Sequence, residues 1–587
     1  MVKSNKLVFS FGSYNVTGML RAKSYCLLCV ICILVFPSTT YSAPPTSLPG
    51  PADVGRIKPE EKTPVLKHTD NEVAVPEGLP MAKAPSGADQ IHFVLHEVNI
   101  EGSTVFSQKE LKEIYAAYLE KEVALDVAWQ IAAAVREHYR VNGYFLSRAY
   151  VPAQNAKGGK LTIKVIEGYI GSVELKDSNA DSYVFQGYID NLKTQRPVKA
   201  DDVENFILNV NDIPGVSFHA VLSVADNQED VNKGAVKLNL LPGTAHSSKG
   251  MVTFDNYGSR FLGPNEVTAV YQGSIIPQQS TTVTALTSVP THELKYGTLT
   301  QSAVIAPNTT LQVTGGYTKA YPGYNLKQFE IVSNSKSLGA NITYQAVRQR
   351  DVNLNFGLTL DSRNTNSDIL NTPLTRDRTR ALRANVNYSG NDNWYGFNSG
   401  NLILTRGLKI FNASNKGDLN LSRADAEPNF TKVEMSLSRL QGITKDWTLF
   451  ANAYGQYSYD PLFTSEEYGY GGQAFGRAYN PSDITGEHGI SGSLELRYTS
   501  FDSPEFVNVL PYIFYDIGEV WNMGTDSSLS FSQSGSSAGF GMRFDTDIHL
   551  SGNIGIAFPL TLPATTPIYG YANRRNPRLL LQISQGF

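Results

Sequence analysis

One stretch of the sequence reads Tyr468-Gly469-Tyr470-Gly471-Gly472-Gln473-Ala474-Phe475-Gly476-Arg477-Ala478-Tyr479. It places a single arginine between two aromatic residues in a glycine-rich setting. Glycine lets a backbone fold tightly at positions where a side chain would clash. The expected turning points are Gly471, Gly472 and Gly476. The stretch therefore predicts a compact loop that presents the guanidinium group of Arg477.

A second stretch reads Phe514-Tyr515-Asp516-Ile517-Gly518-Glu519-Val520-Trp521. Read as a strand, it places Phe514, Asp516 and Gly518 on one face, because side chains alternate along a strand. A guanidinium fork matches a carboxylate, so Arg477 and Asp516 are natural partners inside a barrel, with Phe514 and Tyr479 beside them. Residue chemistry alone leaves two other interpretations open: a porin constriction loop, or an extracellular loop with an unpaired arginine.

Length and composition narrow the class of protein. The chain has 587 residues, which is too long for one compact domain. Its net charge of -4 and pI near 6.2 give no basic face for nucleic acid, so no nucleic-acid partner is expected. The mean hydropathy of -0.22 is low for a helical membrane protein. It is compatible with a transmembrane β-barrel, in which only alternate residues face lipid.

The N-terminal 43 residues have the pattern of a secretory signal peptide. Basic residues precede the apolar run from Tyr25 to Phe36, and small residues follow it. The three cysteines, Cys26, Cys29 and Cys32, lie within this run. Without polar flanks their spacing predicts no metal site, and the mature chain is expected to have no disulfides. Residues 44–89 are rich in Pro, Lys, Glu and Ser and predict a linker with room for one short helix.

Residues 90–168 and 169–243 share one pattern, β-α-α-β-β. In the first copy, a strand over 92–100 precedes a capping box at Ser107-Gln108-Lys109-Glu110, a second helix, and strands over 145–152 and 160–167. The second copy has strands over 171–175, 217–224 and 234–240 and helices over 183–192 and 201–210. An internal repeat of about 75 residues predicts two related α/β domains.

From residue 244 to Phe587 the helical patterns vanish and alternating runs recur. If the 344 residues of 244–587 form sixteen strands, each strand with its loop has about 21 residues, which suits a thin outer membrane. The region therefore predicts an antiparallel barrel of about sixteen strands, against the alternative of a soluble all-β domain. The alternating runs are 250–256, 266–274, 309–318, 353–360, 379–388, 432–438, 448–457, 491–499, 539–544, 553–558 and 578–584.

Enzymatic motifs are weak. The stretch Gly535-Ser536-Ser537-Ala538-Gly539 fits the pattern of a nucleophile elbow, but a strand pattern follows it where a helix is required. A hairpin loop is the expected identity. The sequence also has no zinc-protease motif and no Walker-type phosphate loop. We therefore expect no enzyme activity, no cofactor and no metal.

Two such α/β modules followed by a barrel resemble the transporters of two-partner secretion, the hemolysin-activation/secretion type. The modules resemble POTRA domains, as in Asn142-Gly143-Tyr144 and in the run from Gly159 to Gly168. Asp255-Asn256-Tyr257-Gly258 is similar to the start of the family's barrel. The family's pore loop carries a V-R-G-Y/F tetrad. Gly476-Arg477-Ala478-Tyr479 keeps its arginine and tyrosine but replaces the valine and glycine, whereas Phe514, Asp516 and Gly518 match the F-x-D-x-G motif in full.

The resemblance implies an outer-membrane channel with POTRA domains in the periplasm. Such a channel captures an unfolded exoprotein and passes it to the cell surface without ATP. The implied partners are the secreted exoprotein, outer-membrane lipid and, during biogenesis, the barrel-assembly machinery. Two alternatives stay open: an assembly insertase of the same superfamily, and a passive porin. The identity of the cargo stays open too.

The resemblance and the pattern also assign roles to particular residues. Arg477 and Asp516 would tether the pore loop. The stretch Pro51–Ile57 is similar to the family's plug helix, although Pro59 and Pro64 limit its length. Phe587 would end the assembly signal, on one strand face with Leu579, Leu581 and Ile583. A helix with Val203, Phe206, Ile207 and Val210 on it, together with the strand edges, is expected to form the cargo groove of the second module.

Overall fold

The structure is a computed structural model that describes residues 48–57, 84–156, 158–175, 183–243, 248–523, 532–561 and 576–587. The predicted signal peptide and most of the predicted linker lie outside these residues. Among the described residues, no helix is both long enough and apolar enough to cross a membrane.

The first module contains two helices over a mixed sheet. The helices are α1 (Gln108–Tyr115) and α2 (Val127–Val141), and the sheet has the order β2-β5-β4. Strand β2 (Glu97–Glu101) runs parallel to β5 (Lys160–Ile166), and β4 (Arg148–Tyr150) pairs antiparallel with β5. The core lies between α2 and the sheet and includes Ala128, Val135, Tyr139, Leu161 and Ile163.

The start of this module differs from the prediction. A single strand was expected over 92–100, but the chain forms β1 (His92–Leu95) and β2, separated at His96. The His96 backbone N–H donates to the Gly159 carbonyl at 2.8 Å, which turns the chain away from β1. Strand β1 pairs instead with β3 (Lys121–Ala124), which lies between the two helices and was not predicted. Four residues are too few to give a clear alternation.

The second module repeats the arrangement. Its helices are α3 (Tyr183–Thr194), α4 (Ala200–Asn211) and the short α5 (Gln228–Asn232). Its sheet has the order β6-β8-β7, formed by β6 (Tyr169–Leu175), β7 (Phe218–Val224) and β8 (Ala235–Pro242). Strand β6 runs parallel to β8, as β2 runs parallel to β5 in the first module.

The groove residues expected on α4 need a correction. Val203, Phe206, Ile207 and Val210 are 1%, 4%, 4% and 1% exposed. They pack in the core of the second module with Phe185, Phe218 and Leu238. The 3-4 spacing of these apolar residues marks the face of α4 that is turned into the domain, which is the usual reason for such spacing. A cargo groove of this module must therefore use other residues.

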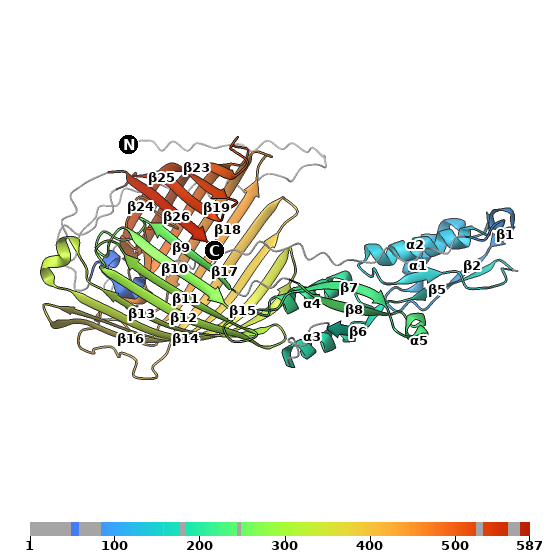
Figure 1. Ribbon diagram of the computed structural model, residues 1–587, viewed down its shortest axis with the longest axis horizontal. Coiled ribbons are helices and arrows are strands. Elements are labelled where there is room, and N and C mark those ends of the chain that lie inside the picture. The colour runs from blue at the N-terminus through green and yellow to red at the C-terminus, as the bar shows by residue number, and fades with distance from the viewer. Residues whose placement is uncertain are drawn as a thin grey trace, which may run out of the picture. The chain divides into compact units, whose positions relative to one another are not determined.

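Sixteen antiparallel strands close into a barrel (Figure 1), as predicted. The barrel closes where β26 pairs with β9 through five residue pairs, from Gln582 opposite Asp255 to Gly586 opposite Met251. The strands, in the order in which they pair, are β9 (Ser248–Asp255), β10 (Glu266–Gly273), β11 (Gln279–Ser288), β12 (Leu294–Ala306), β13 (Thr309–Ala320), β14 (Val332–Arg348), β15 (Val352–Ile369), β16 (Thr372–Asn391), β17 (Gly396–Gly407), β18 (Thr431–Gly442), β19 (Trp447–Ser458), β22 (His488–Tyr498), β23 (Val507–Trp521), β24 (Ser532–Thr546), β25 (Leu550–Pro559) and β26 (Arg578–Gly586).

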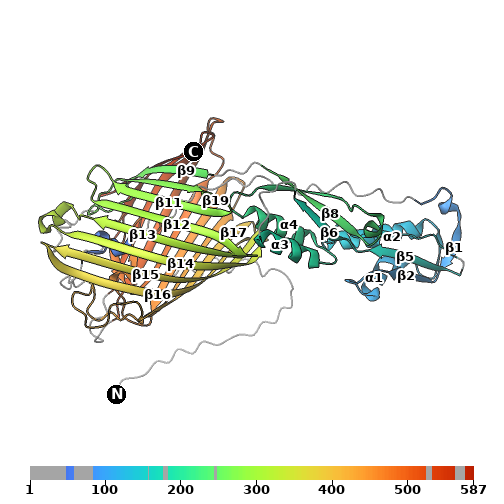
Figure 2. The ribbon, with the colours of Figure 1, turned by 60° about the horizontal axis from the view of Figure 1, so that its bottom comes forward.

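Alternation along the strands separates an apolar outer face from a polar inner face. On β15, Phe356, Leu358 and Leu360 are exposed and face outward. The residues between them, Gly357 and Thr359 among others, face the lumen and are half-buried. The neighbouring strands β13 to β16 lie side by side in Figure 2 and follow the same rule. This pattern is typical of a barrel that has lipid outside and a polar interior.

The stretch Gly535–Gly539 is not a hairpin loop as predicted, because it lies within β24. Its small residues make room for neighbouring rings. A Cβ atom at Gly535 would lie 2.5 Å from the Tyr470 ring, and one at Gly539 would lie 2.6 Å from the Phe514 ring. The glycines and serines therefore reflect close packing at the inner wall, and they mimic a turn signal.

Candidate functional site

The glycine-rich stretch belongs to a loop, residues 459–487, that joins β19 to β22. Within it, β20 (Tyr468–Tyr470) pairs with β21 (Ile484–Gly486) as a short antiparallel ribbon. Gly471, Gly472 and Gly476 have φ values of 115°, 109° and 74°, which L-residues rarely adopt. At Gly471, a Cβ atom would also lie 2.2 Å from the Asn480 carbonyl oxygen. The three glycines therefore allow the turns that place Arg477 at the tip of the loop, between β20 and β21.

Arg477 contacts the inner wall of the barrel at Asp516. Its Nε and Nη2 atoms donate to the two Asp516 oxygens at 3.2 and 3.0 Å, and its backbone N–H donates to Asp516 Oδ2 at 3.0 Å. Asp516 is 0% exposed and Arg477 is 8% exposed. The guanidinium carbon also lies 3.7 Å from the centre of the Phe514 ring. The loop is thus attached to β23 by a bidentate, buried ion pair with an aromatic floor.

A second carboxylate shares Arg477, and the sequence reasoning missed it. Glu495 on β22 accepts from Arg477 Nη1 at 2.7 Å and also contacts Arg497 and Arg543. Ser493 completes the pocket by accepting from Arg477 Nη2 at 2.8 Å. The sequence does indicate that Ser493 and Glu495 face the inside of the barrel. Ser493 and Glu495 alternate with Leu494 and Leu496, so their strand places a charge on its inner face.

Aromatic packing fixes the ribbon of the loop on the same wall. Tyr470 is 1% exposed and lies over Gly518, where a Cβ atom would meet its ring at 2.3 Å. The Tyr479 hydroxyl lies 2.7 and 2.6 Å from the carbonyl oxygens of Ser536 and Thr561, either of which can accept its single proton. The Tyr470 and Tyr479 ring centres are 5.9 Å apart. Gly518 therefore leaves the space that the Tyr470 ring occupies.

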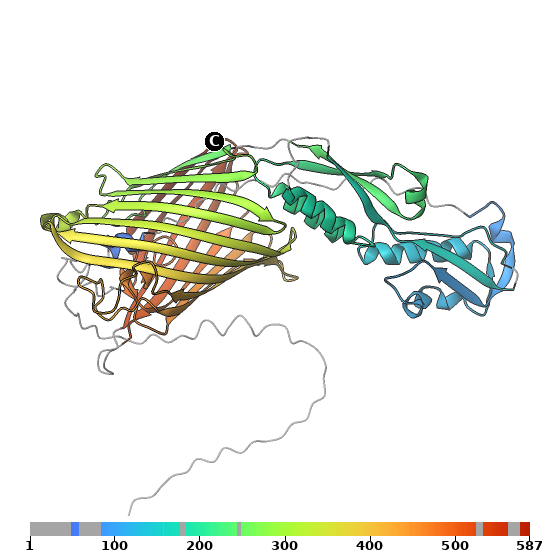
Figure 3. The same cartoon turned by 90° about the horizontal axis from the view of Figure 1, so that it is seen from below.

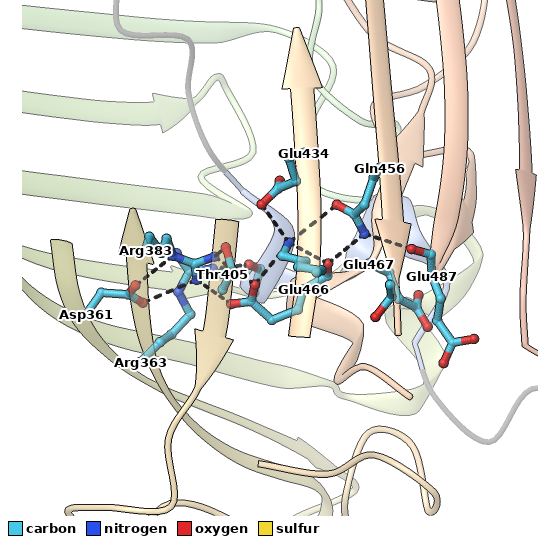
Figure 4. Close-up of polar contacts among 12 residues, drawn as sticks. Asp361, Arg363, Arg383, Thr405, Glu434, Gln456, Glu466, Glu467 and Glu487 are labelled. Carbon is cyan, nitrogen blue, oxygen red and sulfur yellow. Dashed lines mark hydrogen bonds and ion pairs between the residues drawn. The ribbon is translucent and has the colours of Figure 1, made fainter. Parts of the chain in front are cut away.

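A second ionic cluster holds the start of the loop (Figure 4). Glu466, in the turn η7 (Thr464–Glu466), accepts from Arg383 on β16 at 2.7 Å and from Lys432 on β18 at 3.1 Å. Arg383 in turn pairs with Asp361 on β15 at 2.7 Å. Lys432 and Glu466 are 2% and 4% exposed. The loop is therefore fixed at two places by buried charges that come from different strands.

The N-terminal segment 48–57 meets the loop at this second cluster. It forms two short 3-10 turns, η1 (Gly50–Ala52) and η2 (Val54–Arg56), in the stretch that is similar to the family's plug helix. Thr464 donates to Asp53 at 2.7 Å, and Arg363 of β15 donates to the Gly55 carbonyl at 2.7 Å. Arg56 pairs with Glu467.

The same segment packs against residues near the ends of several strands. Val54 is 2% exposed and packs with Leu286, Leu294 and Ala320 of β11, β12 and β13. Figure 3 shows the segment, in blue, among the strands of the barrel. Because its partners are inward-facing residues, the segment lies within the lumen, beside the start of the loop.

Phe587 lies at the closing seam of the barrel. Its backbone N–H donates to the Gly250 carbonyl at 2.9 Å and its carbonyl accepts from Gly250 at 2.8 Å. The ring is 74% exposed and lies where a side chain at Gly250 would stand, 2.3 Å from the Cβ position. Leu579 and Ile583 are exposed on the same outer face of β26.

These clusters attach the loop and the N-terminal segment to the barrel wall through ion pairs and hydrogen bonds, which are reversible. The described residues contain no group of His, Cys, Asp and Glu side chains that could hold a metal ion. The charged residues instead neutralise one another across strands, loop and N-terminal segment. Such contacts can break and re-form without covalent change.

A closed sixteen-strand barrel with α/β modules before it defines the class of outer-membrane transporters with periplasmic POTRA domains. The model of the family "Haemolysin secretion/activation protein ShlB/FhaC/HecB" matches residues 308–542. The model of the ShlB-type POTRA domain matches residues 93–168. The chain is thus similar to this family of two-partner secretion transporters in its first module and in much of its barrel. Proteins of this family transport exoproteins across the outer membrane.

Curated relatives and solved structures agree with this assignment. The heme/hemopexin transporter protein HuxB of Haemophilus influenzae (strain 86-028NP) is 25% identical over 82% of this chain and 86% of its own. The outer membrane transporter CdiB of Dickeya dadantii (strain 3937) is 24% identical, with the same coverage of 82% and 86%. The structure of CdiB from Escherichia coli superposes with a TM-score of 0.68 at 18% identity, covering 86% of this chain and 92% of that one. This last likeness concerns the fold alone.

Proposed function

We propose that this chain recognises an unfolded exoprotein in the periplasm through its POTRA domains and passes it through the barrel to the cell surface. We further propose the domain limits 1–43 for the signal peptide, 44–89 for the linker, 90–168 and 169–243 for the two POTRA domains and 244–587 for the barrel. Progress of the cargo would come from binding and from folding outside, since no ATP is present in the periplasm.

The observation that carries the proposal is the loop held inside the lumen by buried charges. Arg477 meets Asp516 and Glu495, and Glu466 meets Arg383 and Lys432, so the loop is fixed by four side chains from four strands. A passive porin needs only a static constriction. A loop attached through ion pairs, beside an N-terminal segment attached in the same way, is a removable obstruction. A removable obstruction suits a channel that opens for a bulky chain.

Cargo recognition must use exposed features of the modules, because the apolar residues of α4 are buried. The free edges of the sheets are β2 and β4 in the first module and β6 and β7 in the second. An extended cargo segment can add a strand to such an edge through backbone hydrogen bonds. Tyr150 on β4 and Val224 on β7 are 39% and 60% exposed and could contact the cargo's side chains.

The test is secretion by cells that carry this chain and an exoprotein from its own genome. We expect deletion of residues 90–168 to abolish secretion while the barrel remains in the outer membrane at near-normal amount. A matched variant with only β4 changed, Ala149→Pro, removes one backbone donor and tests the edge specifically. If the deletion variant secretes cargo normally, the recognition role is wrong. If it instead lowers the amount of other barrels in the membrane, the insertase alternative is favoured.

A further inference from the structure

Four amide side chains stand side by side on the inner wall of the barrel. Gln345 on β14 is opposite Asn355 on β15, Asn355 is opposite Asn387 on β16, and Asn387 is opposite Asn401 on β17. We call these four residues the amide row. With strands about 4.8 Å apart, the row is about 14 Å long, which matches about four residues of an extended chain.

The row faces the lumen. Its residues alternate with exposed outer residues on each of the four strands: Tyr344, Phe356, Tyr388 and Leu402, which are 50%, 45%, 41% and 45% exposed. The four amides themselves are half-buried. The Oδ1 atoms of Asn355 and Asn401 have no hydrogen-bond partner among the described residues. Two of the four amides thus have a buried acceptor oxygen that the protein itself leaves unused, which is uncommon for groups removed from water.

Most of the wall around the row is uncharged. Toward the periplasmic ends the next inward positions are Asn353, Ser389, Ser399 and, on β14, Arg348, whose charge is paired with Asp212 at 2.7 Å. Toward the other end they are Thr343, Gly357, Asn385 and Ile403, and the charges of Asp361 and Arg383 lie six and four residues along their strands from the row. From β18, which pairs with β17, to β24, nearly every barrel strand carries an inward charge: Lys432, Glu434, Glu495, Arg497, Asp516 and Arg543.

The loop and the N-terminal segment leave the row open. The loop is attached to β22 and β23 through Arg477, to β24 through Tyr479, and to β16 and β18 through Glu466. The N-terminal segment contacts β15 at Arg363, eight residues beyond Asn355. The mostly uncharged wall therefore extends from the periplasmic ends of β14–β17 toward the obstruction without being covered by it.

We propose that the amide row is a binding surface for the backbone of an extended polypeptide in the lumen. This inference rests on the proposed function and adds the place and chemistry of the contact. A primary amide both donates and accepts, so it can bond to the N–H and C=O groups of any sequence. A charged wall would hold segments of opposite charge and repel others. An uncharged wall binds each segment weakly, which a moving chain requires.

Crosslinking locates the contact. The only cysteines of the sequence precede residue 43, so a single introduced cysteine is unique in the barrel. The full-length protein, placed in a lipid bilayer, receives from its periplasmic side a 30-residue peptide of Gly, Ser and Asn with one cysteine. We expect Asn387→Cys to form a disulfide with it about fivefold to tenfold faster than Asn452→Cys. Asn452 is a matched control, an inward asparagine of β19 opposite Ser493.

A charge test complements the crosslink. We expect Asn355→Asp with Asn387→Asp to lengthen channel block by a Lys-containing version of the peptide about fivefold to tenfold, since two ion pairs become possible. Asn452→Asp is expected to change it little. Equal crosslinking at positions 387 and 452, or block unaffected by charge in the row, would overturn the inference and leave the proposed function intact. A peptide that neither blocks the channel nor crosslinks at any lumen position would count against the proposed function itself.

Discussion

Arg477 shows how one residue connects loop, strand and channel. It is 8% exposed, and its guanidinium group makes four hydrogen bonds, two to Asp516, one to Glu495 and one to Ser493. Breaking a buried pair by removing one partner costs about 3–5 kcal/mol, because the other charge stays buried. That free energy is large enough to shift a loop between two positions. It is small beside the backbone hydrogen bonds that hold sixteen closed strands.

We therefore expect Arg477→Ala or Asp516→Ala to reduce secretion and to change channel conductance, with barrel abundance near wild type. Secretion is measured by cargo in the medium and abundance by heat-modifiable mobility of the barrel. The exchange Arg477→Asp with Asp516→Arg asks whether the two residues act as a pair. Recovery should be partial, because Glu495 would then face the new aspartate. Adding Glu495→Gln should increase the recovery. Strictly additive defects would contradict the pairing.

Gly518 is the second residue whose role can be tested. A Cβ atom there would meet the Tyr470 ring at 2.3 Å, so Gly518→Ala should displace Tyr470 and with it the ribbon of the loop. We expect an altered conductance and a loss of secretion comparable to that of Arg477→Ala. Gly492→Ala on β22 is the matched control, since the nearest atoms to its Cβ position are 3.9 Å away. Equal effects of the two variants would show that Gly518 matters only as a strand residue.

The pairing of Arg477 with Asp516 could be read from the sequence, because an arginine in a glycine-rich loop and an inward aspartate on a strand are complementary. The sequence did not predict that Glu495 also binds Arg477. Alternation places Glu495 on an inner face, but it does not say which of several inner charges lies opposite the loop. The prediction that the apolar stripe of α4 forms a cargo groove was contradicted for a related reason. A helix stripe marks a contact face, and sequence alone does not tell a domain core from a partner's groove.

At the scale of elements, the chain length was compatible with the sixteen barrel strands, whereas it did not predict the lengths of the individual strands. Strands β14, β15 and β16 have 17, 18 and 20 residues, about twice what crosses the membrane. Their polar ends lack the alternation that marks the central parts. These extensions carry Asp361, which pairs with Arg383 at 2.7 Å, and Arg363, which donates to the Gly55 carbonyl of the N-terminal segment. Residues just beyond the predicted run 353–360 thus help to hold the obstruction.

The two α/β modules should form an independent element. We expect residues 90–243 to fold as a soluble monomer with the circular dichroism of mixed α/β structure, since each module has its own core. Random-coil spectra would contradict the domain assignment. Within this fragment, Ser107→Ala should lower the free energy of unfolding by about 1 kcal/mol, because the capping box of α1 is lost. Lys109→Ala, at an exposed position of the same helix outside the capping box, provides the comparison.

The capping box also gives a pH dependence. The hydrogen bonds from the Ser107 side chain and backbone to Glu110 lower the pKa of that carboxyl in the folded module. A carboxyl with a lowered folded pKa contributes stability above its unfolded pKa, and that contribution is lost as the pH falls through the folded pKa. The difference in stability between wild type and Ser107→Ala should therefore shrink on acidification. A difference that is constant from neutral to acidic pH would contradict this origin.

At the scale of the whole molecule, the barrel depends on one short seam. Strands β9 and β26 share five residue pairs, and Phe587 extends them by two hydrogen bonds to Gly250. The neighbouring contacts, β9 with β10 and β25 with β26, have eight pairs each. The last residue of the chain therefore strengthens the contact that closes the barrel. The same residue would be the end of the signal that we propose for the assembly machinery.

Removing Phe587 should accordingly reduce the amount of heat-modifiable barrel in the outer membrane. Two causes can be separated by a second variant. Phe587→Ala keeps the backbone bonds to Gly250 and removes only the ring, so a loss as large as that of the deletion points to recognition of the aromatic ring. A smaller loss points to closure of the seam by the backbone. Phe558→Ala is the control, because Phe558 is also an outward-facing aromatic, on β25, and is 39% exposed. If the deletion leaves barrel abundance unchanged, Phe587 has neither role, and five residue pairs suffice to close the barrel.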